Sequence, residues 1–165
     1  MKTKELFLCL FFFGCYISSK AQLKKDSLNI FTFEEVEKLQ TENPKPILAF
    51  IYTDWCKFCN LMKKTTFRNS NIVKVLNRDF YVVFLNSETK NEITFLDKTF
   101  VYKPNGTNSG THQLATELGT IDGKISYPTT IILNEKYEID LKLNIFLNTK
   151  DFEEIVNVYL KLDKF

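Results

Sequence analysis

The sequence predicts an α/β fold in which helices flank a central mixed sheet of about four strands. Helical patterns alternate with two short, continuously apolar runs, ILAFIY at 47–52 and FYVVFLN at 80–86. This alternation is typical of parallel strands joined by a helical crossover and covered on both faces. The segment 127–143 contains two further strand-like runs around a tight turn at 134–136, which predicts an antiparallel pair.

The first 21 residues have the composition of a secretory signal peptide. Two lysines precede twelve uncharged residues at 6–17, and small residues follow at Ser19 and Ala21. The apolar run is shorter than the roughly 20 residues of a membrane-spanning helix. We expect a signal peptide at 1–21, cleavage before Gln22, one domain at 22–165, and export to the periplasm.

Two alternatives for this N-terminal segment remain open. One is a buried N-terminal helix. The other is a lipid anchor, because FFGC at 12–15 loosely resembles a bacterial lipobox. Lipidation of Cys15 would turn an exported soluble protein into a membrane-anchored one.

The charge of the domain argues against nucleic-acid binding. The whole chain has 22 Lys and Arg against 20 Asp and Glu, and removal of residues 1–21 leaves 19 of each. The basic residues are scattered among acidic ones, whereas nucleic-acid binding domains gather them on one face. With 44% hydrophobic residues, the chain can bury a core without a disulfide framework. We expect a monomer.

Two helices of the domain carry clear start signals. Thr32 and Glu35 form a capping box ahead of apolar residues at helical spacing, which predicts a helix that ends by Asn43. A last helix is expected to begin near Asn148. Its inward face is predicted to carry Phe152, Ile155, Val156, Tyr159 and Leu160.

The stretch 87–111 departs from the helix–strand rhythm and is predicted to be an insertion. It should contain a small strand or hairpin that ends in a turn, and a short helix capped by Thr111 should follow. Phe95, Phe100 and Tyr102 give this stretch an aromatic cluster. We expect these rings to cover the sheet edge, with a partner-binding surface as the alternative.

Cys56 and Cys59 are the only cysteines of 22–165, and they follow the first buried strand directly. At i and i+3 of a helix, their Cβ atoms lie about 5–6 Å apart, close to disulfide distance. A thiolate at a helix N-terminus is stabilised by unpaired N–H groups and the helix dipole, and the thiolate is the reactive form. Lys57 adds a positive charge. The pattern favours a redox pair, with Cys59 as the less exposed, resolving cysteine.

Other uses of the two cysteines are less consistent with the sequence. Structural zinc usually has four ligands, and 22–165 offers only two cysteines and His112, on a distant segment. We expect His112 to be a surface residue of a short helix. A structural disulfide would close a very small loop, and the stabilisation from a disulfide grows with loop length. We therefore expect no metal and no bound cofactor.

The order of elements and two motifs resemble the thioredoxin fold over about 30–163, with the 87–111 insertion before the cis-proline loop. Residues 55–59, WCKFC, match the W-C-x-x-C motif of that superfamily. Residues 127–129, YPT, match its X-cis-Pro-Thr loop. The run YTDWCKFCNLMKKTTF is most similar to exported bacterial thioredoxin-like proteins and to the C-terminal domain of the DsbD-type thiol:disulfide interchange protein.

This resemblance implies roles for particular residues. Cys56 would attack a client disulfide and Cys59 would release the product. Pro128 would be cis, face the two cysteines and shape the peptide-binding groove with Tyr127 beside it. Trp55 is expected to shield the active face, with core packing as the alternative.

The sequence also departs from the thioredoxin pattern. The buried Asp that assists the second cysteine of thioredoxin is replaced by Phe50. Asp54 could take over that role, or be an exposed turn residue. The two residues between the cysteines, Lys57 and Phe58, differ from those of thioredoxin and of strong oxidants, so the direction of electron flow is left open.

The sequence therefore predicts an exported enzyme, a thiol–disulfide oxidoreductase that reduces or isomerises protein disulfides through Cys56 and Cys59. Its partners would be disulfide-containing client proteins and a thiol reductant of the DsbD type, membrane-bound or soluble. A thiol peroxidase on the same fold is disfavoured because its cysteine motif is absent. The rival class is a redox-inactive thioredoxin-like binding module with a static disulfide.

Overall fold

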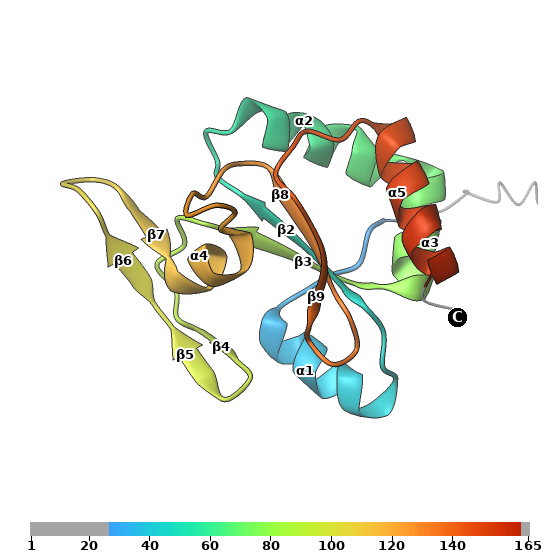
Figure 1. Ribbon diagram of the computed structural model, residues 1–165, viewed down its shortest axis with the longest axis horizontal. Coiled ribbons are helices and arrows are strands. Elements are labelled where there is room, and N and C mark those ends of the chain that lie inside the picture. Colours follow the sequence, from blue (N-terminus) through green and yellow to red (C-terminus); the bar gives the residue numbers. More distant parts are fainter. Residues whose placement is uncertain (1–26, 163–165) are drawn as a thin grey trace, which may run out of the picture.

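The computed structural model describes residues 27–162. Its centre is a five-stranded mixed sheet with strand order β1-β3-β2-β8-β9, covered by helices on both faces (Figure 1). The strands β1, β2 and β3 are parallel, β8 is antiparallel to β2, and β9 is antiparallel to β8. The predicted α/β class and mixed sheet are confirmed. The strand beyond the expected four is β1, which has two residues.

The bounds of the elements follow the chain. The strands are β1 (Ile30–Phe31), β2 (Ile47–Tyr52), β3 (Tyr81–Asn86), β4 (Ile93–Phe95), β5 (Lys98–Phe100), β6 (Tyr102–Pro104), β7 (Gly110–His112), β8 (Thr129–Leu133) and β9 (Ile139–Leu143). The helices are α1 (Phe33–Glu42), α2 (Lys57–Lys64), the 3-10 turn η1 (Thr66–Arg68), α3 (Ser70–Asp79), α4 (Gln113–Gly119) and α5 (Thr149–Leu162).

Strand β2 lies at the centre of the sheet and is buried on both faces. Successive side chains of a strand point to opposite faces, so Ile47, Ala49 and Ile51 join one hydrophobic cluster, while Leu48 and Phe50 join the other. This is why the sequence run 47–52 is apolar without alternation.

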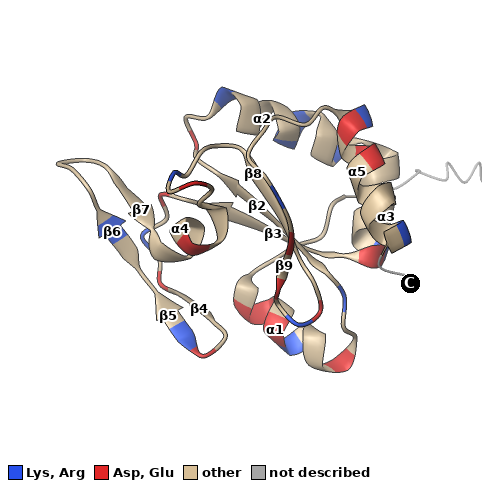
Figure 2. Ribbon diagram, viewed as in Figure 1, with Lys and Arg blue, Asp and Glu red and all other residues tan. Residues whose placement is uncertain are grey.

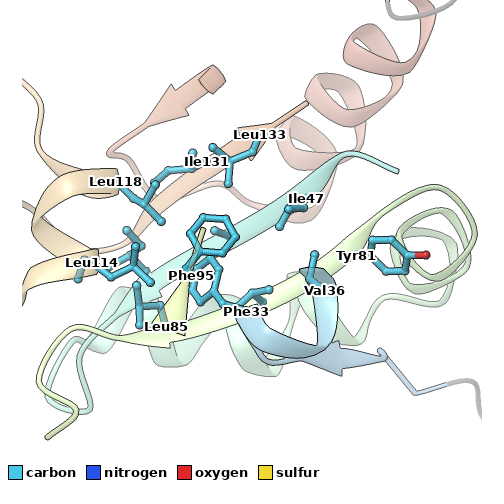
Figure 3. Close-up of a cluster of buried hydrophobic side chains, with 14 of the residues drawn as sticks. Phe33, Val36, Ile47, Tyr81, Leu85, Phe95, Leu114, Leu118, Ile131 and Leu133 are labelled. Carbon is cyan, nitrogen blue, oxygen red and sulfur yellow. The ribbon is translucent and has the colours of Figure 1, made fainter. Parts of the chain in front are cut away.

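The first cluster lies between the sheet and the helices α1 and α4. Figure 3 shows Val36 of α1 pointing toward Ile47 of β2, and Phe33 of α1 beside Phe95. The rings of Phe33 and Phe95 are 4.8 Å apart. The second cluster packs α2, α3 and α5 against the opposite face.

The capping signals predicted from the sequence are present. Thr32 Oγ1 accepts a 3.1 Å hydrogen bond from the Glu35 amide, and Glu35 Oε2 accepts a 2.8 Å bond from the Thr32 amide. Asn148 Oδ1 accepts from the amides of Lys150 and Asp151 at the start of α5. Both helices therefore begin where their local signals predict.

Between β3 and α4 the chain forms two separate two-stranded sheets, β4-β5 and β6-β7. Phe95 and Phe100 are buried in the first cluster, so a partner-binding surface is ruled out for these two rings. Tyr102 is half-buried.

No helix within residues 27–162 has both the length and the hydrophobicity to cross a membrane.

The expectation for His112 is wrong, because its side chain is fully buried. His112, and not Thr111, is the N-cap of α4: its Nδ1 accepts a 3.3 Å bond from the Leu114 amide. Since Nδ1 accepts, the hydrogen of the neutral ring lies on Nε2, which donates to the Asn91 carbonyl at 3.1 Å. Burial lowers the pKa of His112, and backbone hydrogen bonds at Asn91 and Phe100 oppose that shift.

Candidate active site

Cys56 lies at the N-terminus of α2, four residues after the end of β2. It is the N-cap residue, and its Sγ accepts a 3.0 Å hydrogen bond from the amide of Cys59. A side-chain acceptor at this position satisfies one of the free N–H groups of the helix. The same donor would stabilise a negative charge on the sulfur, which favours the thiolate form.

A disulfide joins Cys56 and Cys59, whose Cα atoms are 5.2 Å apart. Cys56 is 5% exposed and Cys59 is fully buried. A client sulfur can therefore approach Cys56 more easily than Cys59, which matches the order of attack expected for the two residues.

Trp55 is a surface residue, so the core-packing alternative is wrong. Its side chain is 66% exposed, and its indole packs edge-on against the ring of Tyr127 with centroids 5.8 Å apart. The Tyr127–Pro128 peptide bond is cis. The structure thus brings the two motifs together, because β2 and β8 are antiparallel neighbours and Ile51 pairs with Thr129 at that end of the sheet.

Two polar residues directly after β3 support this arrangement, and sequence reasoning missed both. Glu88 Oε1 accepts a 2.9 Å hydrogen bond from Trp55 Nε1. Ser87 is fully buried, and its hydroxyl lies 2.6 Å from the hydroxyl of Tyr127. Burial raises the pKa of Tyr127, while hydrogen bonds to Ser87 and Thr111 act in the opposite direction. The sequence signal that could have identified Ser87 and Glu88 was their position directly after β3, the strand next to β2.

Asp54 and Lys57 are both exposed. Asp54 Oδ2 accepts a 3.0 Å bond from Asn86 Nδ2, and its carbonyl accepts from Asn60. Within residues 27–162, neither side chain is hydrogen-bonded to a cysteine. Asp54 is therefore an exposed residue at the edge of the site, and Lys57 contributes charge at the first turn of α2.

Phe50 occupies the strand position where the resemblance would place a buried carboxyl group. Its ring is fully buried and packs against Phe67 and Phe84, with centroids 4.8 and 5.2 Å apart. Phe84 is also its partner across β2 and β3. This part of the site is consequently hydrophobic on the sheet side.

Lys63 of α2 is a third residue that sequence reasoning missed. Its side chain is half-buried, and its Nζ lies over the ring of Tyr52, 2.8 Å from the centroid. Burial lowers the pKa of Lys63, and the charge of Asp54 partly offsets this. Burial, followed by the charge of Asp54, raises the pKa of Tyr52.

Exposed apolar side chains flank Cys56. Phe58, between the two cysteines, is 60% exposed, and its ring lies 5.6 Å from that of Phe146 in the loop after β9. Together with Trp55 it gives the site a hydrophobic rim. Among residues 27–162, no cluster of three or more His, Cys, Asp or Glu is placed to bind a metal ion.

The fold and this site define a thioredoxin-like protein: a C-x-x-C disulfide begins the helix after the central strand, and a cis-proline loop lies at the same end of the sheet. The chain belongs to the thioredoxin-like domain family, whose model matches residues 33–144. The predicted resemblance to the thioredoxin superfamily is thereby confirmed.

Solved structures agree with this fold. A DsbH oxidoreductase superposes with a TM-score of 0.60 at 16% identity, over 88% of this chain and 93% of that one. A thioredoxin from Thermus thermophilus gives 0.58 at 15% identity, over 81% and 88%. A disulphide isomerase from Xylella fastidiosa Temecula1 gives 0.53 at 15% identity, over 81% and 99%. At these identities the likeness concerns the fold.

A curated relative is similar over a shorter segment. Spermatogenesis-associated protein 20 of Mus musculus is 31% identical over 68 residues, which are 41% of this chain and 8% of that protein. This chain therefore spans a small part of that relative's length.

Proposed function

We propose that this protein is an exported thiol–disulfide oxidoreductase that reduces or isomerises protein disulfides through Cys56 and Cys59. The observation that carries the proposal is the capping geometry of Cys56. Its sulfur sits at the N-terminus of α2, accepts the Cys59 amide hydrogen and is bonded to the buried Cys59 sulfur. A structural disulfide would need neither a capping sulfur nor an exposed aromatic rim.

The reaction follows from the accessibility of the two sulfurs. In the reduced protein, the Cys56 thiolate attacks one sulfur of a client disulfide, and the other client sulfur leaves as a thiolate. Cys59 then attacks Cys56 Sγ, which forms the Cys56–Cys59 disulfide and releases the second client thiol. The client gains two electrons, and a thiol reductant of the DsbD type would return the pair to the dithiol form.

The rim of the site supports peptide clients. Trp55 and Phe58 are 66% and 60% exposed, and large aromatic side chains of this kind contribute most to binding energy at protein interfaces. The loop at Tyr127 and Pro128 precedes β8. An extended client could form main-chain hydrogen bonds with this loop.

The proposed location rests on the sequence alone. Residues 1–21 have the signal-peptide pattern and lie outside the described part of the structure. We propose export to the periplasm, with cleavage before Gln22, or lipidation at Cys15 as the alternative. The mass of the exported protein separates these products.

The first test is a redox equilibrium of residues 22–165 against glutathione, followed by the fluorescence of Trp55, the only tryptophan. A potential near about −270 mV would mark a reductant, and one near about −120 to −180 mV an oxidant or isomerase. A pair that stays oxidised even in strong dithiols would contradict the proposal and favour a binding module with a static disulfide.

A matched pair of variants tests the order of attack. Cys59→Ser should trap a mixed disulfide with a client peptide through Cys56, and Cys56→Ser should not. Both variants should keep the fold, since each replaces one sulfur by oxygen. A trapped adduct on Cys59 in the Cys56→Ser variant would reverse the assigned roles.

A further inference from the structure

The resolving step poses a problem for proton transfer. Cys59 attacks as a thiolate, yet its side chain is fully buried, and burial in apolar surroundings raises the pKa of a thiol. The sheet offers no acceptor at position 50, where Phe50 is packed between other phenylalanines. Some other group must take the proton if the pair is to cycle near neutral pH.

Lys63 lies where such a group is needed. It follows Cys59 by four residues on α2, and residues at i and i+4 of a helix have Cβ atoms about 5–6 Å apart. Long side chains on a helix lean toward its N-terminus and cover the preceding turn. By this rule we expect the Lys63 side chain to extend toward the turn that contains Cys59.

The position of the amine over Tyr52 supports this direction. Tyr52 is at the end of β2 and packs against the hydrophobic cluster that contains Cys59, and Lys63 Nζ lies over its ring. The amine is thereby held on the sheet side of α2, at the edge of the cluster that buries the thiol.

We propose that Lys63 accepts the proton of the Cys59 thiol and leaves a thiolate paired with an ammonium group during the resolving step. The inference rests on the proposed redox function of Cys56 and Cys59, and it assigns to α2 the task that a strand carboxyl group performs in thioredoxin.

The charged groups around Lys63 are consistent with a proton acceptor. The Lys63 amine lies over the ring of Tyr52 of β2, the charge of Asp54 in the loop before α2 acts on it, and Arg68 of η1 lines the same surface pocket. Burial shifts the pKa of Lys63 downward, which favours the neutral amine, and the attraction of Asp54 limits the shift. Figure 2 shows only basic charges on α2 itself, so a thiolate at Cys59 has no acidic neighbour on that helix.

A path for the proton to solvent is also present. Lys63 lines a surface pocket of about 400 Å³ together with Phe67, Arg68 and Phe84. Water in this pocket can exchange protons with the amine, although the thiol itself has no exposed surface.

The resolving step transfers one proton and exchanges one disulfide bond. A Lys63 amine that has released its proton to water accepts the Cys59 proton, and the Cys59 thiolate attacks Cys56 Sγ of the mixed disulfide. The Cys56–Cys59 bond forms while the Cys56–client bond breaks, and the electron pair leaves on the client sulfur as a thiolate. The Lys63 ammonium returns its proton to water.

The reaction of the reduced protein with an aromatic disulfide that releases a coloured thiol resolves the two steps. The first thiol reports the attack by Cys56 and the second reports resolution by Cys59. In Lys63→Met we expect the second phase to slow about tenfold or more at pH 7, the change that one pKa unit makes in the thiolate fraction. The first phase should change little, and the second should recover at high pH.

Lys64→Met is the matched control, since Lys64 is the exposed neighbour on the same helix. Both of its phases should follow those of the wild type. A Lys63→Met variant whose second phase keeps the wild-type rate and pH midpoint would overturn the inference.

A second measurement is independent of turnover. In the Cys56→Ser background, Cys59 is the only thiol of residues 22–165, and its ionisation is read from thiolate absorbance near 240 nm. Adding Lys63→Met should raise the Cys59 pKa, and an unchanged pKa would overturn the inference. If the wild type shows no second coloured phase, the redox proposal fails, while this titration still decides whether Lys63 and Cys59 are coupled.

Discussion

Trp55 and Glu88 are joined by a 2.9 Å hydrogen bond from the indole Nε1 to the carboxylate Oε1, although 33 residues separate them in the sequence. The bond ties the residue before Cys56 to the residue that follows Ser87 at the end of β3. Since Trp55 is largely exposed, this contact and the edge-on packing on Tyr127 hold its ring at the site.

Glu88→Ala should release the Trp55 indole while leaving the fold stable, because surface substitutions usually change stability by about 0.5 kcal/mol or less. We expect a lower fluorescence anisotropy of Trp55 and a reduction in client turnover of a few fold, on the order of one hydrogen bond. Glu88→Gln is the control, because its amide oxygen can still accept from Nε1. Equal anisotropy in all three proteins would show that packing on Tyr127 suffices.

Tyr127→Phe should destabilise the protein by about 1–3 kcal/mol, because it deprives the buried Ser87 hydroxyl of its partner. Urea unfolding of this variant, of Ser87→Ala and of the double variant gives a double-mutant cycle. The double variant should lose less than the sum of the two single changes. Strict additivity would mean that the two hydroxyls do not interact in solution, and that Thr111 supplies the relevant partner of Tyr127.

His112 should make stability depend on pH. Its folded-state pKa is lowered by burial, so the unfolded state binds the proton more readily. The contribution of neutral His112 to the free energy of unfolding is fully present above the histidine pKa of the unfolded chain, about 6.5. This contribution is lost as the pH drops through the lower pKa of the folded state. Urea unfolding between pH 7.5 and 5 measures this loss.

His112→Asn is the control for that titration. Its side-chain oxygen can still accept from the Leu114 amide at the N-cap, but it does not ionise. The variant should lose less stability than the wild type over the same pH range. An identical loss in both proteins would assign the pH dependence to the carboxylates instead.

Phe50→Asp should be among the most damaging single substitutions, because it removes a fully buried ring and places a carboxyl group against Phe67 and Phe84. Phe50→Ala is expected to cost about 3–5 kcal/mol through lost burial and a cavity, and the aspartate should cost more. Denaturant unfolding of the two variants checks the order. If Phe50→Asp were the more stable variant, a water-accessible proton route would have to exist at this position.

The sequence was most informative where the signal is local. The capping box at Thr32 and Glu35 and the apolar run of β2 depend on near neighbours, so both could be read from the chain. The position of Cys56 at a helix N-terminus followed from the same kind of pattern. The antiparallel β8 and β9 were predicted because a tight turn allows no other pairing.

The features that could not be predicted from the sequence depend on contacts between segments that are distant along the chain. His112 is the last residue of β7, directly before α4, and α4 packs against the core. A lone histidine in a polar stretch does not reveal this burial. The four-residue spacing of Cys59 and Lys63 was visible, but the burial of Lys63 depends on Tyr52 in a neighbouring strand. Sequence spacing alone does not show which face of a short helix will be covered.

The central place of β2 affects how the site behaves during fluctuations. This strand is hydrogen-bonded on both sides, to β3 and to β8, and amide protons in such a strand exchange with solvent only through the largest opening motions of a domain. The two outlying hairpins lack that double pairing, so they can open at lower free energy. The segment that leads into Cys56 is attached to β2, which opens only at the highest free energy. The two sulfurs can therefore keep their spacing while the hairpins open and close.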